Sequence, residues 1–334
     1  MEIVYLSPAV NIPIGGIKVI YRHSEMLNRA GIASSVFHPE DAAFSCNWFE
    51  HNATIRSGKR KLFRKKHEMY EKTRFDPKTD FIVIPEVWAN QIGSQCIQRN
   101  LRYGIFVQNG YMIHQGGKKN IALLNTVYEK ADLILSISED TTEVLKLSFP
   151  NLNSNKICRV IPNIADAFKS QYPPKKKIIT YMPRKLTGHA EMIHFFLEQS
   201  LPEDWKLTAI DNKSEEEVVA LLKESSIFLS FCEAEGFALP PIEAAMAGNL
   251  VIGYTGEGAK EYFKSPIFTE VHCGDLIDFI GRIKHMINQL QRIIGSQAYQ
   301  EQLRNLSEYY SSETESRLLL EFGRRAQQIV NQVD

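Results

Sequence analysis

The chain has 334 residues, of which 44% are hydrophobic and 23% are charged. This length suits two globular domains of about 150 residues each, and the composition allows each of them to bury a core. The 39 basic and 39 acidic side chains cancel, so the overall charge gives no argument for a nucleic-acid partner, and we expect none.

The cysteines and the first residues indicate the compartment. The five cysteines are scattered and form no C-x-x-C pair, which is typical of a reducing compartment and predicts neither a zinc site nor a disulfide framework. The opening MEIVYLSP is short and carries Glu2, so we interpret it as a strand and not as a signal peptide. No apolar run approaches the roughly 18 residues that a membrane span needs. We therefore expect a cytoplasmic protein, with peripheral contact at the inner face of the plasma membrane left open.

In the first half of the chain, short β-rich runs alternate with helical patterns, which predicts a parallel sheet with crossover helices. A helix is expected over 16–31, with Gly31 just beyond its C-cap. VIPNIAD (160–166) is expected to be a last strand that leads into a turn. The other expected strands cover residues 3–6, 34–37, 81–85, 104–108 and 133–138. Together these segments predict an N-terminal Rossmann-like, acceptor-side domain over residues 1–168.

Two prolines and a basic run mark residues 169–177 as a linker. After it the alternation resumes, which predicts a second Rossmann-like domain over 178–310 that binds the donor. A terminal helix over 311–334 could pack back on the first domain. The second domain is expected to have strands at 178–182, 205–210, 227–231 and 250–254, and helices near 188–200, at 214–225 and after Pro241. The predicted fold class is α/β, with two doubly wound domains facing a central cleft and a helical C-terminal tail. Ligands of such sheets bind beyond the carboxyl ends of the strands.

The stretch EAEGFALPPIEAAMAG (233–248) places three glutamates among apolar residues. Pro240 and Pro241 suit the first turn of a helix. Glu243 would then lie in that first turn, where the helix dipole favours a carboxylate by a few tenths of a kcal/mol. One interpretation is therefore a dipole-compensating Glu243 with a solvated Glu235. The other is a pair of acids that bind a positively charged or hydroxyl-rich ligand.

The spacing of the two acids, E-x7-E, favours the second interpretation. Together with Ser230, the segment closely resembles the signature of retaining glycosyltransferases of family four, which have the GT-B fold. Other segments resemble landmarks of that family in the same order along the chain. These are LILSISEDTTEVLK, VIPNIAD with Ile164 where glycine is common, and GEGAKEYF (256–263).

This resemblance implies a nucleotide-diphosphate sugar as donor substrate. Glu243 would accept hydrogen bonds from the ribose diol, and Glu235 would face the transferred sugar and stabilise the positive charge that develops there. Glycine at 236 would let the backbone approach the ligand closely. The backbone N–H groups near the helix N-terminus would bind phosphate or sugar oxygens, and they belong to Gly236, Phe237, Ala238 and Leu239.

The diphosphate needs cationic stabilisation, from a metal ion or from basic side chains. FDPKTD lacks the spacing of a DxD motif, so we expect a metal-independent enzyme without a cofactor. The resemblance implies that Arg184, after the strand at 178–182, binds the pyrophosphate. Lys185 is adjacent to Arg184, whereas the family's lysine stands a few residues later, and a solvated basic turn is the alternative.

Between the first strand and its helix lie Gly15 and Gly16. They resemble the family's glycine-rich loop near the donor phosphates and the acceptor, although a plain tight turn would also use glycine.

One departure from the family concerns GIFVQNGYMIHQ, where many members carry a histidine just after the strand. Here Gln108 and Asn109 occupy this place, and His114 follows later. Gln108 or Asn109 could hydrogen-bond a sugar or acceptor, but neither can carry a proton, and the transferred sugar is left open. We expect front-face attack with the leaving phosphate as proton acceptor. A double displacement with Glu235 as nucleophile is the alternative.

Residues 56–74 hold nine Lys or Arg and two Glu. Such a run is usually a solvated face, but it could also bind anionic lipid or a phosphorylated, lipid-linked acceptor.

The sequence thus predicts a retaining glycosyltransferase that acts on a glycan or lipid-linked saccharide in surface polysaccharide biosynthesis. The alternatives are a nucleotide-sugar epimerase and a non-catalytic module that binds nucleotide or glycan.

Overall fold

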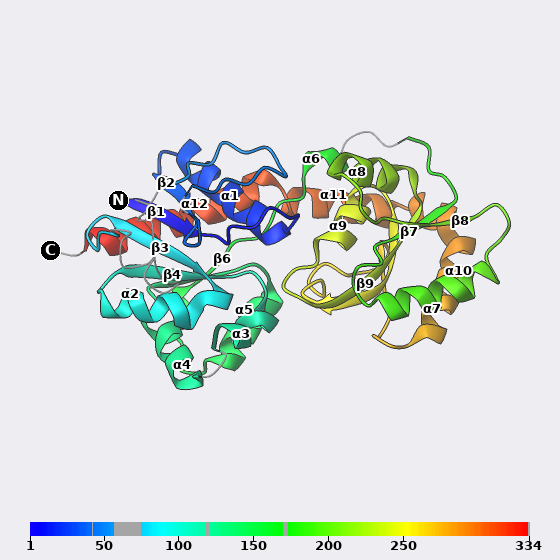
Figure 1. Cartoon of the computed structure of the whole chain (residues 1–334). Helices are drawn as coiled ribbons and strands as arrows, with labels where there is room; N and C mark the ends of the chain where they lie inside the picture. The colour runs from blue at the N-terminus through cyan, green and yellow to red at the C-terminus, as the bar shows by residue number, and fades with distance from the viewer. Residues whose placement is uncertain (42, 57–74, 118–119, 170–172, 333–334) are drawn as a thin grey trace. The chain divides into compact units, whose positions relative to one another are not determined.

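The computed structural model describes residues 1–41, 43–56, 75–117, 120–169 and 173–332. Most of the basic stretch, residues 57–74, lies outside the described residues, as does part of the linker. The chain forms two compact units, each built around its own parallel sheet (Figure 1). The first unit comprises Met1–Ile137, Thr141–Ile161 and Glu315–Asp334, and the second comprises Ser138–Asp140 and Pro162–Thr314.

The first unit contains a six-stranded parallel sheet in the order β2-β1-β3-β4-β5-β6. Its central strands are apolar along nearly their whole length because helices cover both faces. The strands are β1 (Glu2–Leu6), β2 (Ser34–Phe37), β3 (Asp80–Pro85), β4 (Arg102–Val107), β5 (Leu133–Ser136) and β6 (Ile157–Arg159). The helices include α1 (Gly15–Arg29), α2 (Ser94–Gln98), α3 (Ile113–Gly117), α4 (Ile121–Lys130) and α5 (Glu139–Ser148), with short turns η1 (Glu86–Trp88), η2 (Ala89–Gly93), η3 (Gly110–Met112) and η4 (Ser154–Lys156).

The C-terminal helix α12 (Ser312–Asn331) packs on this first sheet, beside β1 and α1 (Figure 1). Its buried face joins the core that contains Ile3, and Gly323 lets the helix approach closely. A Cβ at Gly323 would lie 2.9 Å from the side chains of Ile32 and Leu27. At the start of the helix, the fully buried Glu315 accepts a 2.7 Å hydrogen bond from Arg22.

The second unit contains a five-stranded sheet in the order β11-β10-β9-β7-β8, and all of its pairs are parallel. Its strands are β7 (Ile178–Tyr181), β8 (Lys206–Ala209), β9 (Ile227–Glu235), β10 (Leu250–Glu257) and β11 (Phe268–Glu270). Its helices are α6 (Asp166–Lys169), α7 (Thr187–Glu198), α8 (Glu215–Glu224), α9 (Leu239–Met246), α10 (Leu276–Ile294) and α11 (Gln297–Tyr309).

The predicted α/β class is confirmed, with two doubly wound halves and a helical C-terminal end. Among the described residues, no helix combines the length and the apolar character that a bilayer crossing requires. The expected cleft between the domains and the predicted domain limits stay predictions.

Two expected strands differ from the structure. The last strand of the first sheet is β6, at Ile157–Arg159, and not the expected 160–166, where no strand forms. Pro162 lacks the N–H that a strand ladder needs. In the second sheet, β9 extends to Glu235, whereas the sequence predicted its end at residue 231. Glu257 of β10 pairs with Glu235 after a shift in register, so the acidic segment begins within a strand and not in a loop.

Candidate active site

In the second sheet, β7 has β8 on one side and β9 on the other, so the strand order reverses between β7 and β9. Ligands of doubly wound sheets bind at the carboxyl ends of the strands at such a reversal. Arg184 and Lys185 follow the end of β7, and Glu235 ends β9. The topology therefore brings the predicted basic pair and the first glutamate to the same edge.

The ammonium group of Lys185 contacts the carboxylate of Glu235 directly. The Glu235 side chain is 20% exposed and that of Lys185 is 47% exposed, so the pair is partly desolvated but open to a ligand. Partial burial lowers the pKa of the Lys185 ammonium, and the adjacent Arg184 guanidinium acts in the same direction. Arg184 itself is exposed. The pair forms a small charged cluster that could meet both an anion and a hydroxyl group.

The chain between Glu235 and α9 is fixed by close backbone packing. A Cβ at Gly258 would lie 2.4 Å from the carbonyl group of Gly236 and 2.5 Å from that of Glu235. The N–H of Gly258 donates to the Glu235 carbonyl at 3.2 Å. The buried hydroxyl of Tyr262 donates to the carbonyl of Phe237 at 3.3 Å and also to that of Ala238. These contacts hold the segment in one conformation.

Glu243 is not in the first turn of its helix, contrary to the sequence-based expectation. The helix begins at Leu239, so Glu243 is its fifth residue, and its first turn contains no acidic residue. Dipole compensation requires the first turn, so it does not explain this acid. Glu243 is half-buried. The pKa of the Tyr262 phenol is raised well above its ordinary value, chiefly by burial and also by the negative charge of Glu243.

The backbone donors expected at the start of α9 are restricted by sequence. Pro240 and Pro241 are the second and third residues of the helix and carry no N–H. Ala238, at the N-cap, has a left-handed conformation with φ of 62°. The amides from Gly236 to Leu239 are those that the sequence predicted to contact a ligand, and this role stays a prediction.

Ser230 has a structural contact. Its buried hydroxyl donates to the carbonyl of Tyr254 at 2.7 Å, which joins β9 to β10.

In the first unit, Gly15 and Gly16 are the first two residues of α1, and not a loop that precedes it. The side chain of Gln108 donates to the carbonyl of Gly16 at 2.9 Å. A Cβ at Gly16 would lie 2.1 Å from the Gln108 side-chain oxygen, so a larger residue there would displace the Gln108 side chain. The structure thus joins the glycine pair to the end of β4.

Asn109 and His114 have local contacts. The side-chain oxygen of Asn109 accepts the N–H of Tyr111 at 2.9 Å and caps η3. Nδ1 of His114 lies 2.8 Å from the Tyr111 carbonyl oxygen on an exposed turn.

Glu86 was missed by the sequence analysis. It directly follows β3, is only 5% exposed, and accepts the N–H of Asn109 at 3.1 Å. Burial raises the pKa of the Glu86 carboxyl to about 7, and its effect outweighs that of the backbone hydrogen bonds, which favour the ionised form. The available signal was an acid placed immediately after the buried strand FIVIP.

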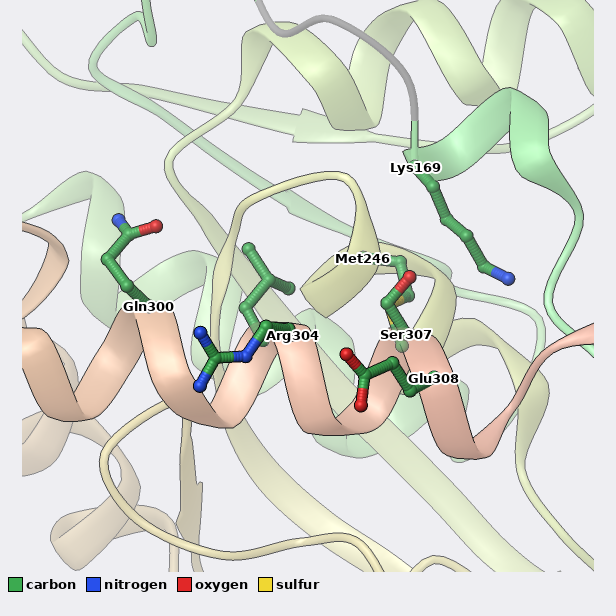
Figure 2. A pocket seen from close by; sticks show the side chains of 7 residues that line it. Lys169, Met246, Gln300, Arg304, Ser307 and Glu308 are labelled. Atoms are coloured by element: carbon green, nitrogen blue, oxygen red, sulfur yellow. The ribbon is translucent and has the colours of Figure 1, made fainter.

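A cavity of about 390 Å³ lies elsewhere in the second unit, between α6, the end of α9 and α11 (Figure 2). Figure 2 shows Gln300, Arg304 and Glu308 on α11 beside this cavity, with Lys169 and Met246 opposite. None of the predicted site residues lines it. Within the described ranges, no group of three or more His, Cys, Asp or Glu side chains is placed to hold a metal ion.

Residues 200–309 match the family model described as Glycosyl transferases group 1. The matched segment contains the acidic pair and the start of α9, but not the basic pair or the candidates in the first unit. A curated relative, an alpha-1,6-glucosyltransferase of Actinobacillus pleuropneumoniae serotype 7, is 28% identical over 120 residues. This match spans 35% of the chain and 33% of the relative, about a third of each.

Solved structures share the whole fold. The lipopolysaccharide outer core galactosyltransferase WaaB covers 98% of this chain and 100% of its own, with a TM-score of 0.69 and 14% identity. Anabaena HepE in complex with UDP-glucose gives the same coverage, with a TM-score of 0.70 and 10% identity. Sucrose-phosphate synthase from Thermosynechococcus elongatus covers 98% of both chains, with a TM-score of 0.66 and 15% identity. At these identities the likeness establishes the GT-B fold alone.

Proposed function

We propose that the protein is a retaining glycosyltransferase that moves a sugar from a nucleotide-diphosphate sugar to a hydroxyl group of a glycan or lipid-linked saccharide. The observation that carries the proposal is the contact between Lys185 and Glu235 at the strand-order reversal of the second sheet. Glu235 also lies within the segment that matches the glycosyltransferase family model.

In this proposal each group has a distinct role toward the donor. Arg184 and Lys185 stabilise the diphosphate, whose negative charge grows as it leaves. The amides from Gly236 to Leu239 donate to phosphate or sugar oxygens. Glu243 accepts hydrogen bonds from the ribose hydroxyls, and Glu235 faces the transferred sugar.

The chemical step that we propose is front-face substitution. The bond from the anomeric carbon to the phosphate oxygen breaks, and the bond to the acceptor oxygen forms on the same face of the sugar. The acceptor proton passes to the leaving phosphate oxygen. Glu235 stabilises the positive charge at the anomeric carbon, and the ammonium group of Lys185 lies beside this carboxylate. The basic pair would make a metal ion unnecessary.

The relatives suggest which substrates to test first. One is named as a glucosyltransferase and another as a galactosyltransferase, and a third has been solved with UDP-glucose. We therefore propose UDP-glucose and UDP-galactose as the first donors, and a role in surface polysaccharide biosynthesis. In the part of the chain that the structure describes, no specific contact favours the epimerase or the non-catalytic module.

The test is the release of nucleoside diphosphate from UDP-glucose and UDP-galactose, with saccharide acceptors, for the wild type and Glu235→Gln. We expect acceptor-dependent release that falls at least 100-fold in Glu235→Gln and stays unchanged in Glu301→Gln, an exposed acid on α11. Equal release by the two Glu235 forms would refute the role of this residue. Release without any saccharide product would refute transfer, and a glycosylated Glu235 would replace front-face attack by double displacement.

A further inference from the structure

The first sheet has its own reversal of strand order, between β1 and β3. β1 leads to the glycine pair at the start of α1, and β3 leads directly to Glu86. β4, on the other side of β3, leads to Gln108 and Asn109. Glu86 therefore stands between the two predicted contact segments of this unit, at the place where doubly wound sheets bind ligands.

The carboxyl group of Glu86 is buried and accepts a hydrogen bond from the backbone at the end of the neighbouring strand, β4. Its Oε1 accepts the N–H of Asn109 at 3.1 Å, and the backbone at Gln108 also favours the ionised form. The short helix α3 packs against the main chain of Glu86 at Gly116. A Cβ at Gly116 would lie 2.2 Å from the Glu86 carbonyl oxygen, so the main chain of Glu86 has no room to shift toward α3.

Among the described residues, no basic side chain forms an ion pair with Glu86. Glu86 acts electrostatically on Tyr128 of α4, a buried phenol whose pKa is raised by burial and further by Glu86. The neighbouring groups at the end of β4, Gln108 and Asn109, are uncharged. The hydrogen-bond partners that favour its ionised form are therefore backbone groups, at Glu86 itself and at Gln108 and Asn109.

From Glu86 the contacts continue to the glycine pair. Asn109, held by Glu86, follows Gln108, whose side chain donates to the Gly16 carbonyl at 2.9 Å. Displacement of the β4 end would move Gln108 and release the start of α1. One buried acid thus connects two segments that the sequence predicted as separate substrate contacts.

We propose that Glu86 is a positioning residue that holds the end of β4 and the start of α1 in their substrate-binding conformation, and that ionisation of its buried carboxyl loosens this edge. Burial disfavours the ionised carboxylate, so ionisation favours opening of this edge to solvent despite the 3.1 Å hydrogen bond from the Asn109 amide. The protonated carboxyl can still accept this N–H through its carbonyl oxygen. That this edge meets substrate rests on the proposed function.

The test is the pH dependence of the Asn109 and Gln108 backbone amides, followed by NMR of the full chain with labelled Asn and Gln. In the wild type we expect both amide resonances to shift with a midpoint near pH 7. Glu86→Gln should abolish this shift, and Glu129→Gln, at an exposed position of α4, should leave it unchanged. A wild-type protein without this midpoint, or the same midpoint in Glu86→Gln, would overturn the proposal.

A parallel titration with UDP-glucose separates the two proposals. If the wild type binds no nucleotide while the Asn109 shift is present, the proposed function fails and the role of Glu86 in holding the β4 end stands. If the nucleotide binds and the shift is absent, the role of Glu86 fails alone.

Discussion

Gly258→Ala tests whether backbone packing holds the acidic segment. The added Cβ would lie 2.4 to 2.5 Å from carbonyl atoms of Gly236 and Glu235, whereas carbon atoms pack at about 3.5 Å or more. Those atoms belong to the main chain, so no side-chain rotation can relieve the overlap. The segment that carries Glu235 would have to move by about 1 Å, and a displacement of that size costs on the order of 100-fold in activity.

We expect Gly258→Ala to lower the free energy of unfolding by about 1–3 kcal/mol, the usual cost of overpacking, and to weaken nucleotide binding about tenfold or more. Urea unfolding and calorimetry with UDP measure the two effects. The control is Gly281→Ala in α10, where no atom lies within 4 Å of the added Cβ and alanine should stabilise the helix by up to about 1 kcal/mol. Wild-type stability and affinity in Gly258→Ala would refute the reasoning.

Three further predictions concern charge. Glu315→Gln should destabilise the first unit by about 3 kcal/mol at pH 7, because it leaves Arg22 and His23 without their buried carboxylate. His23 and Arg22 lower the pKa of Glu315 despite its burial, so the stability that it contributes is present above about pH 4.5 and is lost as the pH falls further. Urea unfolding from pH 7 to about 3 measures this loss, and the same pH dependence in Glu315→Gln would contradict the prediction. The raised pKa of Glu86 acts in the opposite sense, because the stability that it contributes is present below about pH 4.5 and is lost as the pH rises through 7. The free energy of unfolding between pH 5 and 8 should therefore depend less on pH in Glu86→Gln than in the wild type. Sugar transfer should be unchanged after removal of divalent metals with EDTA, and restoration of a lost activity by Mg²⁺ or Mn²⁺ would contradict the proposed role of Arg184 and Lys185.

The strands and their order along the chain were largely predictable because buried parallel strands are short, continuous apolar runs between helical patterns. The limits of β9 and α9 could not be predicted from the sequence. Ala234 and Ala238 adopt positive φ, with values of 44° and 62°, although alanine does not favour that region. Tertiary packing against Gly258 and Tyr262 imposes this conformation, and it moves Glu243 into the second turn of its helix.

Candidate site residues could be predicted where they belong to one sequence motif. Contacts between residues that lie far apart in the sequence could not be predicted. The acidic pair belongs to a single short segment, so its spacing was visible. Lys185 differs in position from the family's lysine, and its contact with Glu235 follows from the strand order of the sheet. Glu86 could not be predicted, because its partner Asn109 comes from a different strand end.

The central claim is that the second unit binds a nucleotide-diphosphate sugar with Glu243 at the ribose. The most direct measurement is a thermal-shift series with UDP, GDP, ADP, dTDP and CMP, on the wild type, Glu243→Ala and the exposed control Glu301→Ala. We predict that one diphosphate stabilises the wild type and Glu301→Ala, and that the shift is much smaller in Glu243→Ala. No shift with any nucleotide, or an equal shift in all three proteins, would contradict the account.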